Sequence, residues 1–365
     1  MGKCFSNGRL QDGLLGIPAL ASHYDGLVIA TGADIPKPFP SIPKSNNVVV
    51  DALDFVAWFN GNPCRFAHLD SHVFGPLFRI NDNQQNGRIR VCIVGAGNVA
   101  LDCARVILAP RTRFQGTDMP ASVLAAIHAT QDRAVTMLVR RGPKHVAFTA
   151  KEIRELASLV PIFMDPKSHD WLMADRQDKD LDRRTKRILD ILAEKAVRTE
   201  TPVVTGGGLT IAFWCNLVGL EDNHAIVMGN EKLATEIPCN LVLFSIGSNP
   251  VNLDPKVLPF NDASFVRDGD LYGKIQTSLG IPVYASGWSL TGSKGVLAST
   301  LQSATLVSQH LMQDLVTAMP NEKRPELPLM STDPRILTWP QWKRMADLEV
   351  SRGEKITDCS NSKQQ

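Results

Sequence analysis

The chain has 365 residues, of which 44% are hydrophobic and 21% are charged, and 39 basic against 37 acidic residues give a formal net charge of +2. This composition excludes a disordered or collagen-like protein, and the near-neutral balance argues against a dedicated nucleic-acid-binding protein, which usually carries a strongly basic surface. The length suggests two domains, and no run approaches the roughly 18 apolar residues that a membrane-spanning helix needs. The opening residues show neither a secretory signal nor an organelle-targeting pattern.

Four apolar runs predict buried β-strands. Residues 24–32 (YDGLVIATG), 89–97 (IRVCIVGAG) and 240–248 (NLVLFSIGS) run into glycine, and residues 134–142 (AVTMLVRRG) end in two arginines before theirs. Continuous apolar runs of this kind are typical of parallel strands that are buried on both faces. Residues 98–108 between them have a helical pattern. Alternating strands and helices predict the α/β class.

The proline-rich segment 35–43 (IPKPFPSIP) predicts a linker, because proline blocks both a helix and a central strand. We therefore expect one domain over residues 46–246. Residues 1–45 and 247–365 would together form a second domain, followed by a polar C-terminal tail.

The clearest motif is a glycine loop between a predicted strand and a predicted helix. The sequence from Gly95 to Ala100 reads GxGxxA, which in this context is typical of dinucleotide binding. Gly95 would permit the tight turn, Gly97 would let the backbone approach a pyrophosphate, and Ala100 would allow close packing. Free N–H groups at the helix start favour phosphate. The same residues would also suit an ordinary turn that needs glycine.

The end of the next predicted strand indicates which dinucleotide binds. An NAD site usually places Asp or Glu there to hold the ribose 2′-hydroxyl, but this chain has Arg140 and Arg141. Guanidinium groups pair well with a 2′-phosphate, so the sequence predicts NADP(H). The spacing is longer than usual because residues 109–130 insert a loop and a short helix. A solvated basic turn is the alternative explanation.

A capping-box pattern follows the arginine pair. Thr149 and Glu152 open a predicted helix in the order that lets each side chain satisfy the other residue's backbone N–H. Glu152 therefore has a structural explanation of its own, and a ligand role for it needs separate support.

These segments together resemble a known family, the mitochondrial NADPH:adrenodoxin (ferredoxin) oxidoreductases and their bacterial ferredoxin–NADP reductase relatives. The resemblance implies a flavoprotein with two Rossmann-like dinucleotide-binding domains. Such a protein takes a hydride from NADPH onto FAD and passes single electrons to a [2Fe-2S] ferredoxin, in mitochondria for the adrenodoxin type. The resemblance rests on six segments of the chain: YDGLVIATGA, DFVAWFNGNP, VCIVGAGNVALDCARVIL, VRRGPKHVAFTAKEIREL, NLVLFSIGSNPVNLDP and VYASGWSLTGSKGVLASTLQSA.

The resemblance also implies roles for individual residues, none of them a metal ligand. For NADP(H) these are Ala96, Gly97, Asn98 and Val99 at the pyrophosphate, Arg140 and Arg141 at the 2′-phosphate, Glu152 near the ribose and Gly295 near the nicotinamide. For FAD they are Trp288 beside the flavin and the backbone N–H groups of Gly295, Val296 and Leu297 near its pyrimidine edge. Without the resemblance, a buried aromatic residue in a glycine-rich turn would be the better interpretation of Trp288.

Two further roles have plainer alternatives. Asp102 would lie near the hydride-transfer region as a catalytic residue, although an acidic residue early in a helix also complements the helix dipole. The basic residues Arg183, Arg184, Lys186 and Arg187 would dock the acidic ferredoxin. Acidic residues at 175, 178, 180 and 182 dilute that pattern, and a solvated helix face is the alternative.

The chain departs from the family in one respect. Family members carry a second glycine fingerprint, for the adenosine half of FAD, ahead of the segment that matches residues 24–32, whereas this chain has only the one at 95–100. We therefore expect the FAD-binding domain to be incomplete. The function is then either an NADPH-dependent flavoenzyme or an NADP(H)-binding module without catalytic activity. A flavin-free NADP dehydrogenase ranks last, because no Ser-Tyr-Lys or histidine-based proton-transfer motif is present.

Overall fold

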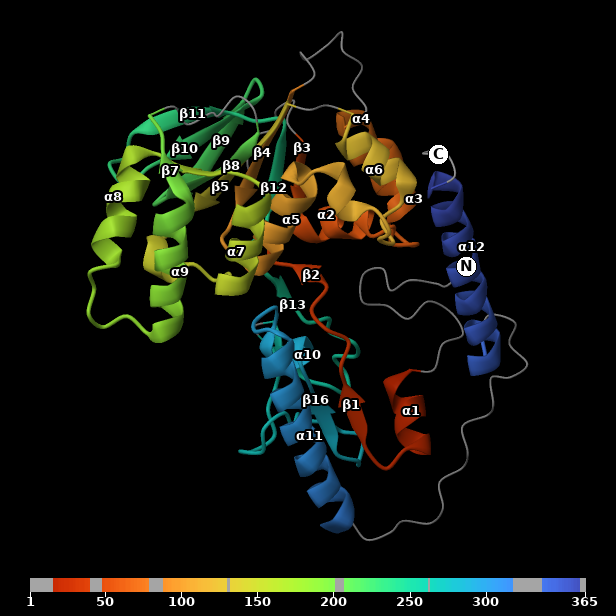
Figure 1. Ribbon diagram of the computed structural model, residues 1–365. Coiled ribbons are helices and arrows are strands. Elements are labelled where there is room, and N and C mark those ends of the chain that lie inside the picture. The colour runs from red at the N-terminus through yellow and green to blue at the C-terminus, as the bar shows by residue number, and fades with distance from the viewer. Residues whose placement is uncertain are drawn as a thin grey trace. The chain divides into compact units, whose positions relative to one another are not determined.

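The structure, a computed structural model, describes residues 16–39, 48–78, 88–129, 132–200, 207–261, 263–317 and 337–361. The chain divides into two compact units (Figure 1). The central unit comprises residues 38–246, and the split unit comprises residues 1–37 together with 247–365.

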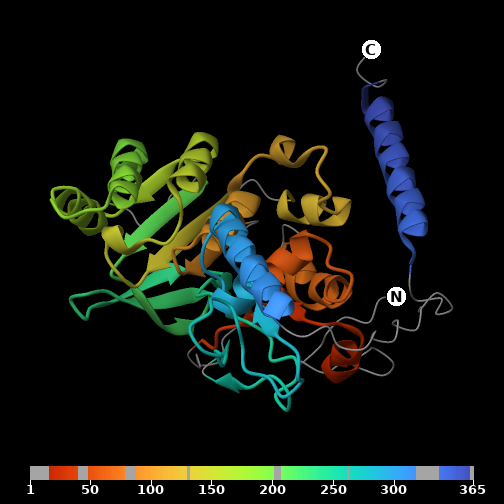
Figure 2. The ribbon, with the colours of Figure 1, turned by 90° about the horizontal axis from the view of Figure 1, so that it is seen from below.

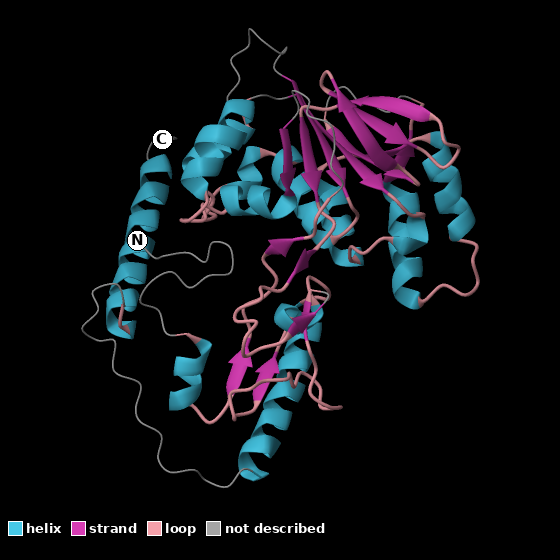
Figure 3. Ribbon diagram, turned by 180° about the vertical axis from the view of Figure 1, so that it is seen from behind, coloured by secondary structure: helices cyan, strands magenta, loops and turns pink. Residues whose placement is uncertain are grey.

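The described residues of the central unit form a parallel sheet of seven strands in the order β3-β12-β4-β5-β8-β6-β7, seen from behind in Figure 3. Three predicted apolar runs supply β4, β5 and β12, so the predicted α/β class is confirmed for this unit. The strands are β3 (Val48–Asp51), β4 (Arg88–Val94), β5 (Asp132–Val139), β6 (Ile162–Met164), β7 (Ala196–Arg198), β8 (Gly208–Phe213) and β12 (Leu241–Phe244).

Alternation along the strands divides the side chains between two faces of the sheet. In β12, Leu241 and Leu243 join the core beneath the helices, whereas Val242 and Phe244 face an antiparallel sheet in the order β11-β10-β9. Figure 2 shows this green sheet on one side of the parallel strands and helices on the other. Its strands are β9 (Asn216–Glu221), β10 (His224–Met228) and β11 (Ala234–Pro238). Both faces are therefore covered, which explains why the central strands are apolar on both faces over most of their length.

The helix predicted over residues 98–108 is confirmed, and its apolar stripe, which includes Ala100, Ala104 and Ile107, is buried against the sheet. The inserted segment contains a 3₁₀ turn (Arg111–Phe114) and a short helix, α6. No helix in the described part of the chain is long and apolar enough to cross a membrane. The helices of this unit are α2 (Ala52–Phe59), α3 (Phe66–Leu69), a π-helical turn (Asp70–Phe74), α4 (Gly75–Phe78), α5 (Asn98–Leu108), α6 (Ala121–Ile127), α7 (Ala150–Leu159), α8 (Pro166–Asp175) and α9 (Arg183–Lys195).

The split unit joins segments from the two ends of the chain. Its parallel pair consists of β1 and β16, and β2 pairs antiparallel with β13. The strand predicted over residues 24–32 is shorter than expected, because its ladder with β16 runs only from Leu27 to Ile29. The elements are α1 (Ile17–His23), β1 (Leu27–Ile29), β2 (Ile35–Pro36), β13 (Ser248–Asn249), β14 (Phe260–Asn261), β15 (Ser264–Phe265), β16 (Val283–Ala285), α10 (Trp288–Thr291), α11 (Leu297–Thr317) and α12 (Trp339–Asn361).

Asp51 connects β3 to α2 and carries a perturbed carboxyl group. Its side chain accepts a hydrogen bond of 2.7 Å from the backbone N–H of Leu53, as an N-cap does, yet the residue is only 7% exposed. Burial raises the pKa of Asp51 from 3.8 to about 6, and the Leu53 hydrogen bond offsets only part of that effect.

This pKa predicts an unusual pH dependence of stability. Because the folded state binds the Asp51 proton more tightly than the unfolded state, the free energy of unfolding should fall as the pH rises from about 4 through about 6. Asp51→Asn keeps a capping side chain, so it should remove this slope, by up to about 3 kcal/mol, in urea unfolding at several pH values.

Asp182→Asn is the matched control, because Asp182 is the exposed N-cap of α9 and hydrogen bonds from Thr185 lower its pKa. Its contribution to stability is lost only as the pH falls below about 4, so the slope between pH 4 and 6 should be unchanged. An Asp51→Asn variant that keeps the wild-type slope would contradict the assignment.

Candidate functional site

The candidate site lies at the carboxyl edge of the parallel sheet. β4 lies between β12 and β5, and all three strands run in the same direction, so the segments that follow them meet at one edge. The chain leaves β4 through α5 to reach β5 on one side, whereas β12 joins the other side much later. Such a switch point is where open α/β sheets bind ligands.

The two glycines of the loop after β4 have different roles. Gly95 has a φ of +126°, and a Cβ there would lie 2.2 Å from the carbonyl oxygen of Ser245, so only glycine fits the turn. Gly97 has an ordinary φ of −103°, and a Cβ there would meet nothing within 4 Å. The space in front of Gly97 is therefore open, as close approach of a ligand requires.

The start of α5 offers backbone N–H groups to an anion. Gly97 is the N-cap and has no side chain to satisfy the N–H groups of the first turn. Ala100, the third residue of α5, is completely buried, so the helix packs closely on the sheet behind the loop. A helix start of this kind binds phosphate through its N–H groups and its partial positive charge.

The segment after the arginine pair is fastened to the glycine loop. The N–H groups of Ala147 and Phe148 both donate to the carbonyl of Ala96, at 2.8 and 3.1 Å, and the N–H of Thr149 donates to Oδ1 of Asn98 at 2.9 Å. The Ala96 carbonyl and the Asn98 side chain are therefore engaged within the protein. What this loop offers to a ligand is its N–H groups.

The arginine pair lies where the sequence predicts, directly after β5. Both Arg140 and Arg141 are exposed, and Nη2 of Arg141 donates to the carbonyl of His145 at 3.3 Å. Since β5 is the neighbour of β4 in the sheet, the guanidinium groups start from the same edge as the glycine loop. The 2′-phosphate contact of this pair stays a prediction.

Glu152 forms only half of the predicted capping box. Its N–H donates to Oγ1 of Thr149 at 3.4 Å, but the N–H of Thr149 goes to Asn98, and the carboxylate of Glu152 instead accepts a hydrogen bond of 2.8 Å from Arg105. The prediction was therefore half wrong, because a distant side chain competes for the Thr149 N–H. The carboxylate that the sequence assigned to the cap is turned towards α5.

Arg105 is a residue of this site that the sequence patterns did not indicate. Its guanidinium group bridges Asp102 and Glu152, and Asp102 lies one helical turn earlier on α5. Burial raises the pKa of Asp102, and the attraction of Arg105 opposes that effect. The spacing of three residues between Asp102 and Arg105 was a readable signal of this pair.

The residues that the resemblance assigned to the flavin lie in the split unit. Trp288 is half-buried at the start of α10, and Leu297, at the start of α11, is 89% exposed. Gly295 has a φ of +93°. The N–H of Val296 already donates to Oγ of Ser299 at 2.9 Å, so one of the three N–H groups expected to face a ligand is satisfied within the protein.

The basic residues expected to dock a ferredoxin lie on the first two turns of α9. Asp182 caps the helix, Asp178 pairs with Lys144 at 3.1 Å, and Asp175 accepts from the N–H of Lys144. Asp175 and Asp178 are therefore engaged with Lys144, whereas Asp182 stays at the start of α9 and accepts hydrogen bonds from its first N–H groups. The exposed cations of the group are Arg183, Arg184, Lys186 and Arg187.

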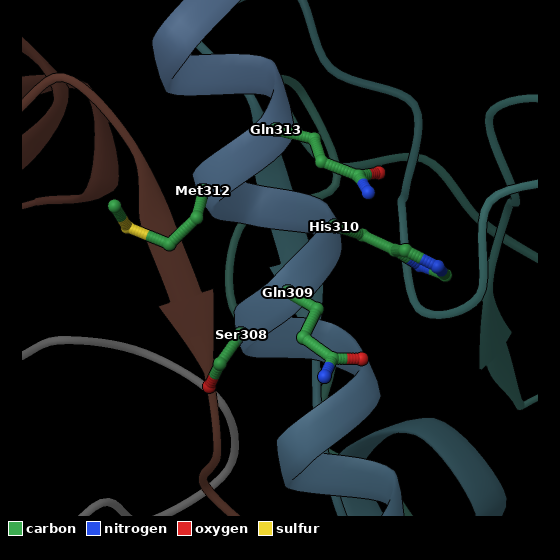
Figure 4. Close-up of a pocket in the computed structure, with 5 residues that line it drawn as sticks. All are labelled: Ser308, Gln309, His310, Met312 and Gln313. Atoms are coloured by element: carbon green, nitrogen blue, oxygen red, sulfur yellow. The ribbon is translucent and has the colours of Figure 1, made fainter.

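The structure also has an open hollow along α11, lined by Ser308, Gln309, His310, Met312 and Gln313 (Figure 4). Ser308 and Met312 point to one side of the helix and His310 and Gln313 to the other. No residue assigned to a site from the sequence lines it. Among the described residues, no group of three or more His, Cys, Asp or Glu side chains could hold a metal ion.

The relatives of this chain among known proteins are named as NADPH:adrenodoxin or NADPH-ferredoxin reductases. No family model matches the chain. It is 29% identical to the mouse mitochondrial NADPH:adrenodoxin oxidoreductase, over 96% of this chain and 74% of that protein. It is 28% identical to the human enzyme, and 26% identical to NADPH-ferredoxin reductase FprA of Mycobacterium leprae over 92% of this chain and 75% of that protein. The chain is similar over most of its length to the adrenodoxin/ferredoxin reductase family.

Solved structures show the fold. Mycobacterium tuberculosis FprA, solved in complex with NADPH, superposes with a TM-score of 0.74 over 93% of this chain and 76% of its own, at 24% identity. The His57Gln mutant of the same protein gives a TM-score of 0.64 over 91% of this chain and 70% of its own, at 22% identity. The chain therefore has the α/β fold of the FprA flavoprotein reductases, with a parallel Rossmann-like sheet.

The two glycines of the loop predict different outcomes for the same substitution. Gly95→Ala should lower the free energy of unfolding by about 2 kcal/mol or more, because the new Cβ meets the Ser245 carbonyl in a strained backbone conformation. Gly97→Ala should leave stability within about 0.5 kcal/mol of the wild type, yet weaken NADPH binding about tenfold by filling the open space.

Urea unfolding and isothermal titration calorimetry measure the two quantities separately. Equal destabilisation by both substitutions would contradict the distinct roles, and unchanged NADPH affinity in Gly97→Ala would remove the glycine loop from the site.

Proposed function

We propose that the protein is an NADPH-dependent flavoprotein oxidoreductase that passes electrons from NADPH through FAD to a [2Fe-2S] ferredoxin of the adrenodoxin type. The observation that carries the proposal is the convergence of the glycine loop with Arg140 and Arg141 at one sheet edge. Its further support is the family similarity, because the relatives are named as NADPH:adrenodoxin and NADPH-ferredoxin reductases.

The central unit would bind NADP(H), and the residues at the sheet edge fit that ligand. The pyrophosphate would be bound by the backbone N–H groups of Ala96, Gly97, Asn98 and Val99. The side-chain oxygen of Asn98 is not available for this, because it accepts a hydrogen bond from the N–H of Thr149. Arg140 and Arg141 would hold the 2′-phosphate. The Glu152 carboxylate, kept in place by Arg105, would accept a hydrogen bond from a ribose hydroxyl. Asp102 pairs with Arg105, so we assign it no chemical step.

The split unit would hold FAD, which takes up a hydride and releases electrons one at a time. The turn before α11 would present its N–H groups to the flavin edge, and it requires glycine at 295, where φ is +93° and a Cβ would lie 2.4 Å from Oγ of Ser299. The start of the 21-residue helix α11 would stabilise negative charge, with Trp288 beside the ring and Gly295 also near the nicotinamide. The N–H groups of Gly295 and Leu297 would contribute more than that of Val296, which is bonded to Ser299.

The second candidate function is an NADP(H)-binding module without catalytic activity. It rests on the glycine loop and the arginine pair, both of which lie in the central unit. Both candidates share the central unit and its preference for NADPH. They differ in whether flavin is retained.

One titration tests both candidates. The purified chain is supplied with FAD, passed through a desalting column and titrated with NADPH without oxygen. Retained visible flavin absorbance that falls on addition of NADPH is expected for the flavoenzyme.

Arg140→Gln with Arg141→Gln should weaken NADPH binding at least about tenfold and NADH binding little, because only NADPH carries the 2′-phosphate.

Arg154→Gln is the matched control, since Arg154 is an exposed arginine on α7. A colourless protein that binds NADPH would support the binding module. Equal losses of NADPH and NADH affinity in the double variant would refute the 2′-phosphate contact, and a wild-type chain that binds neither nucleotide would end both proposals.

The proposed partner is an acidic [2Fe-2S] ferredoxin that docks on the exposed cations of α9. Reversing Arg183, Arg184 and Arg187 to glutamate should weaken ferredoxin association at least tenfold at low salt and less at high salt, because the attraction is Coulombic. Surface plasmon resonance at two ionic strengths measures both effects.

Reversing three exposed cations of other segments, Lys232, Lys256 and Arg267, is the control of equal charge. If both triple variants lose affinity to the same extent, the effect is one of net charge and α9 is not the docking face.

The proposed compartment is the mitochondrion, as in the mouse relative, and detection of the tagged chain outside purified mitochondria would refute it.

A further inference from the structure

Trp214 emerges beside the arginine pair. It directly follows β8, and β8 pairs in parallel with β5 so that Phe213 lies opposite Val139. The next residue on each strand is Trp214 on one side and Arg140 on the other. The indole therefore starts from the sheet edge that carries the proposed 2′-phosphate contact.

The backbone at Trp214 is strained. Its φ is +55°, a left-handed conformation that a bulky residue rarely adopts and that costs of order 1 kcal/mol. The chain is held there by neighbouring hydrogen bonds, in which the N–H of Cys215 donates to the carbonyl of Val139 at 3.0 Å and the N–H of Trp214 to that of Arg141 at 3.5 Å. Strained residues of this kind cluster at ligand sites.

The indole lies directly against Gly142, the residue after the arginine pair. A Cβ at Gly142 would be 3.1 Å from both Nε1 and Cζ2 of Trp214 and 3.2 Å from Cε2. The φ of Gly142 is −70°, which any residue adopts, so glycine is needed here for room rather than for backbone freedom. Trp214 also packs on the core beneath the helices, but it remains only half-buried.

We propose that Trp214 is the stacking wall for the adenine ring of the nucleotide whose 2′-phosphate Arg140 and Arg141 hold. This inference rests on the proposed NADP(H) binding and deepens it, because it assigns the adenosine half of the ligand to the edge between β5 and β8. An aromatic residue on the turn that follows β8, next to two arginines that follow β5, matches a 2′-phosphorylated adenosine, which carries a planar base next to a dianion. Stacking of a base on an aromatic side chain contributes about 1–3 kcal/mol.

Gly142 is part of the same proposed adenine-binding site. It leaves the space that the indole occupies, so a methyl group at this position should displace the ring without removing it. Gly142→Ala and Trp214→Ala should then have the same effect on adenine binding, although only one of them deletes the aromatic side chain.

The test uses adenosine 2′,5′-bisphosphate, which lacks the nicotinamide half, as the probe in calorimetry. Trp214→Ala and Gly142→Ala should each weaken its binding about tenfold, and Trp214→Phe should stay within about threefold of the wild type because a stacking ring remains. NADPH should lose affinity in parallel. Trp171→Phe is the control, since Trp171 also packs partly buried on the same core.

Tryptophan fluorescence distinguishes stacking on Trp214 from a purely structural role, because the probe quenches Trp214 emission only if it lies against the indole. The probe should quench emission in the wild type and in Trp171→Phe, and this quenching should disappear in Trp214→Phe. If Trp214→Ala does not fold, the Gly142→Ala affinity and the Trp214→Phe quenching decide. Unchanged affinity in Gly142→Ala, or quenching that survives Trp214→Phe, would overturn the inference. A wild-type chain that binds neither the probe nor NADPH would instead overturn the proposed function, and this inference with it.

Discussion

The site depends on the carbonyl of Ala96, which accepts two backbone hydrogen bonds from the segment that follows the arginine pair. A carbonyl oxygen has two lone pairs, and here both are used by Ala147 and Phe148. The turn after β5 is thereby fixed to the turn after β4. The β4–β5 ladder already places Arg140 and Arg141 beside the glycine loop, and this contact fixes the chain that follows them.

The bonds at Ala96 also decide which polar groups the loop presents. Peptide carbonyls repel phosphate, so a loop that binds a pyrophosphate must turn its carbonyls away. The Ala96 carbonyl faces the protein, and Oδ1 of Asn98 is bonded to Thr149. The same contacts that join the two turns therefore leave a loop surface dominated by N–H groups, which explains how a short uncharged sequence can attract an anion.

Local patterns predicted the parts of the fold that local forces decide. The bounds of α5 were correct because its apolar stripe and the glycine before it lie within one continuous segment. The order β3-β12-β4-β5 was not predictable, since β12 is separated from β4 by well over a hundred residues of chain and pairing depends on the whole core. The capping box was half wrong for the same reason, because Asn98 is remote in sequence from Thr149. Trp214 carried no signal at all, as its importance lies in a backbone angle and a contact with Gly142.

The acidic side chains near the site explain why charge alone does not define it. Asp102, Glu152 and Glu155 lie on neighbouring turns of α5 and α7 and would repel a phosphorylated nucleotide if they were unpaired. Arg105 binds Asp102 and Glu152, and Arg113 binds Glu155 at 2.6 Å, so these carboxylates are largely neutralised by cations of the same layer. In the described part of the chain, Arg140 and Arg141 take part in no such ion pair, so their charge is left for a ligand. Under the proposed function, discrimination between NADPH and NADH would therefore depend on the ion pairs of Arg105 and Arg113 as well as on Arg140 and Arg141.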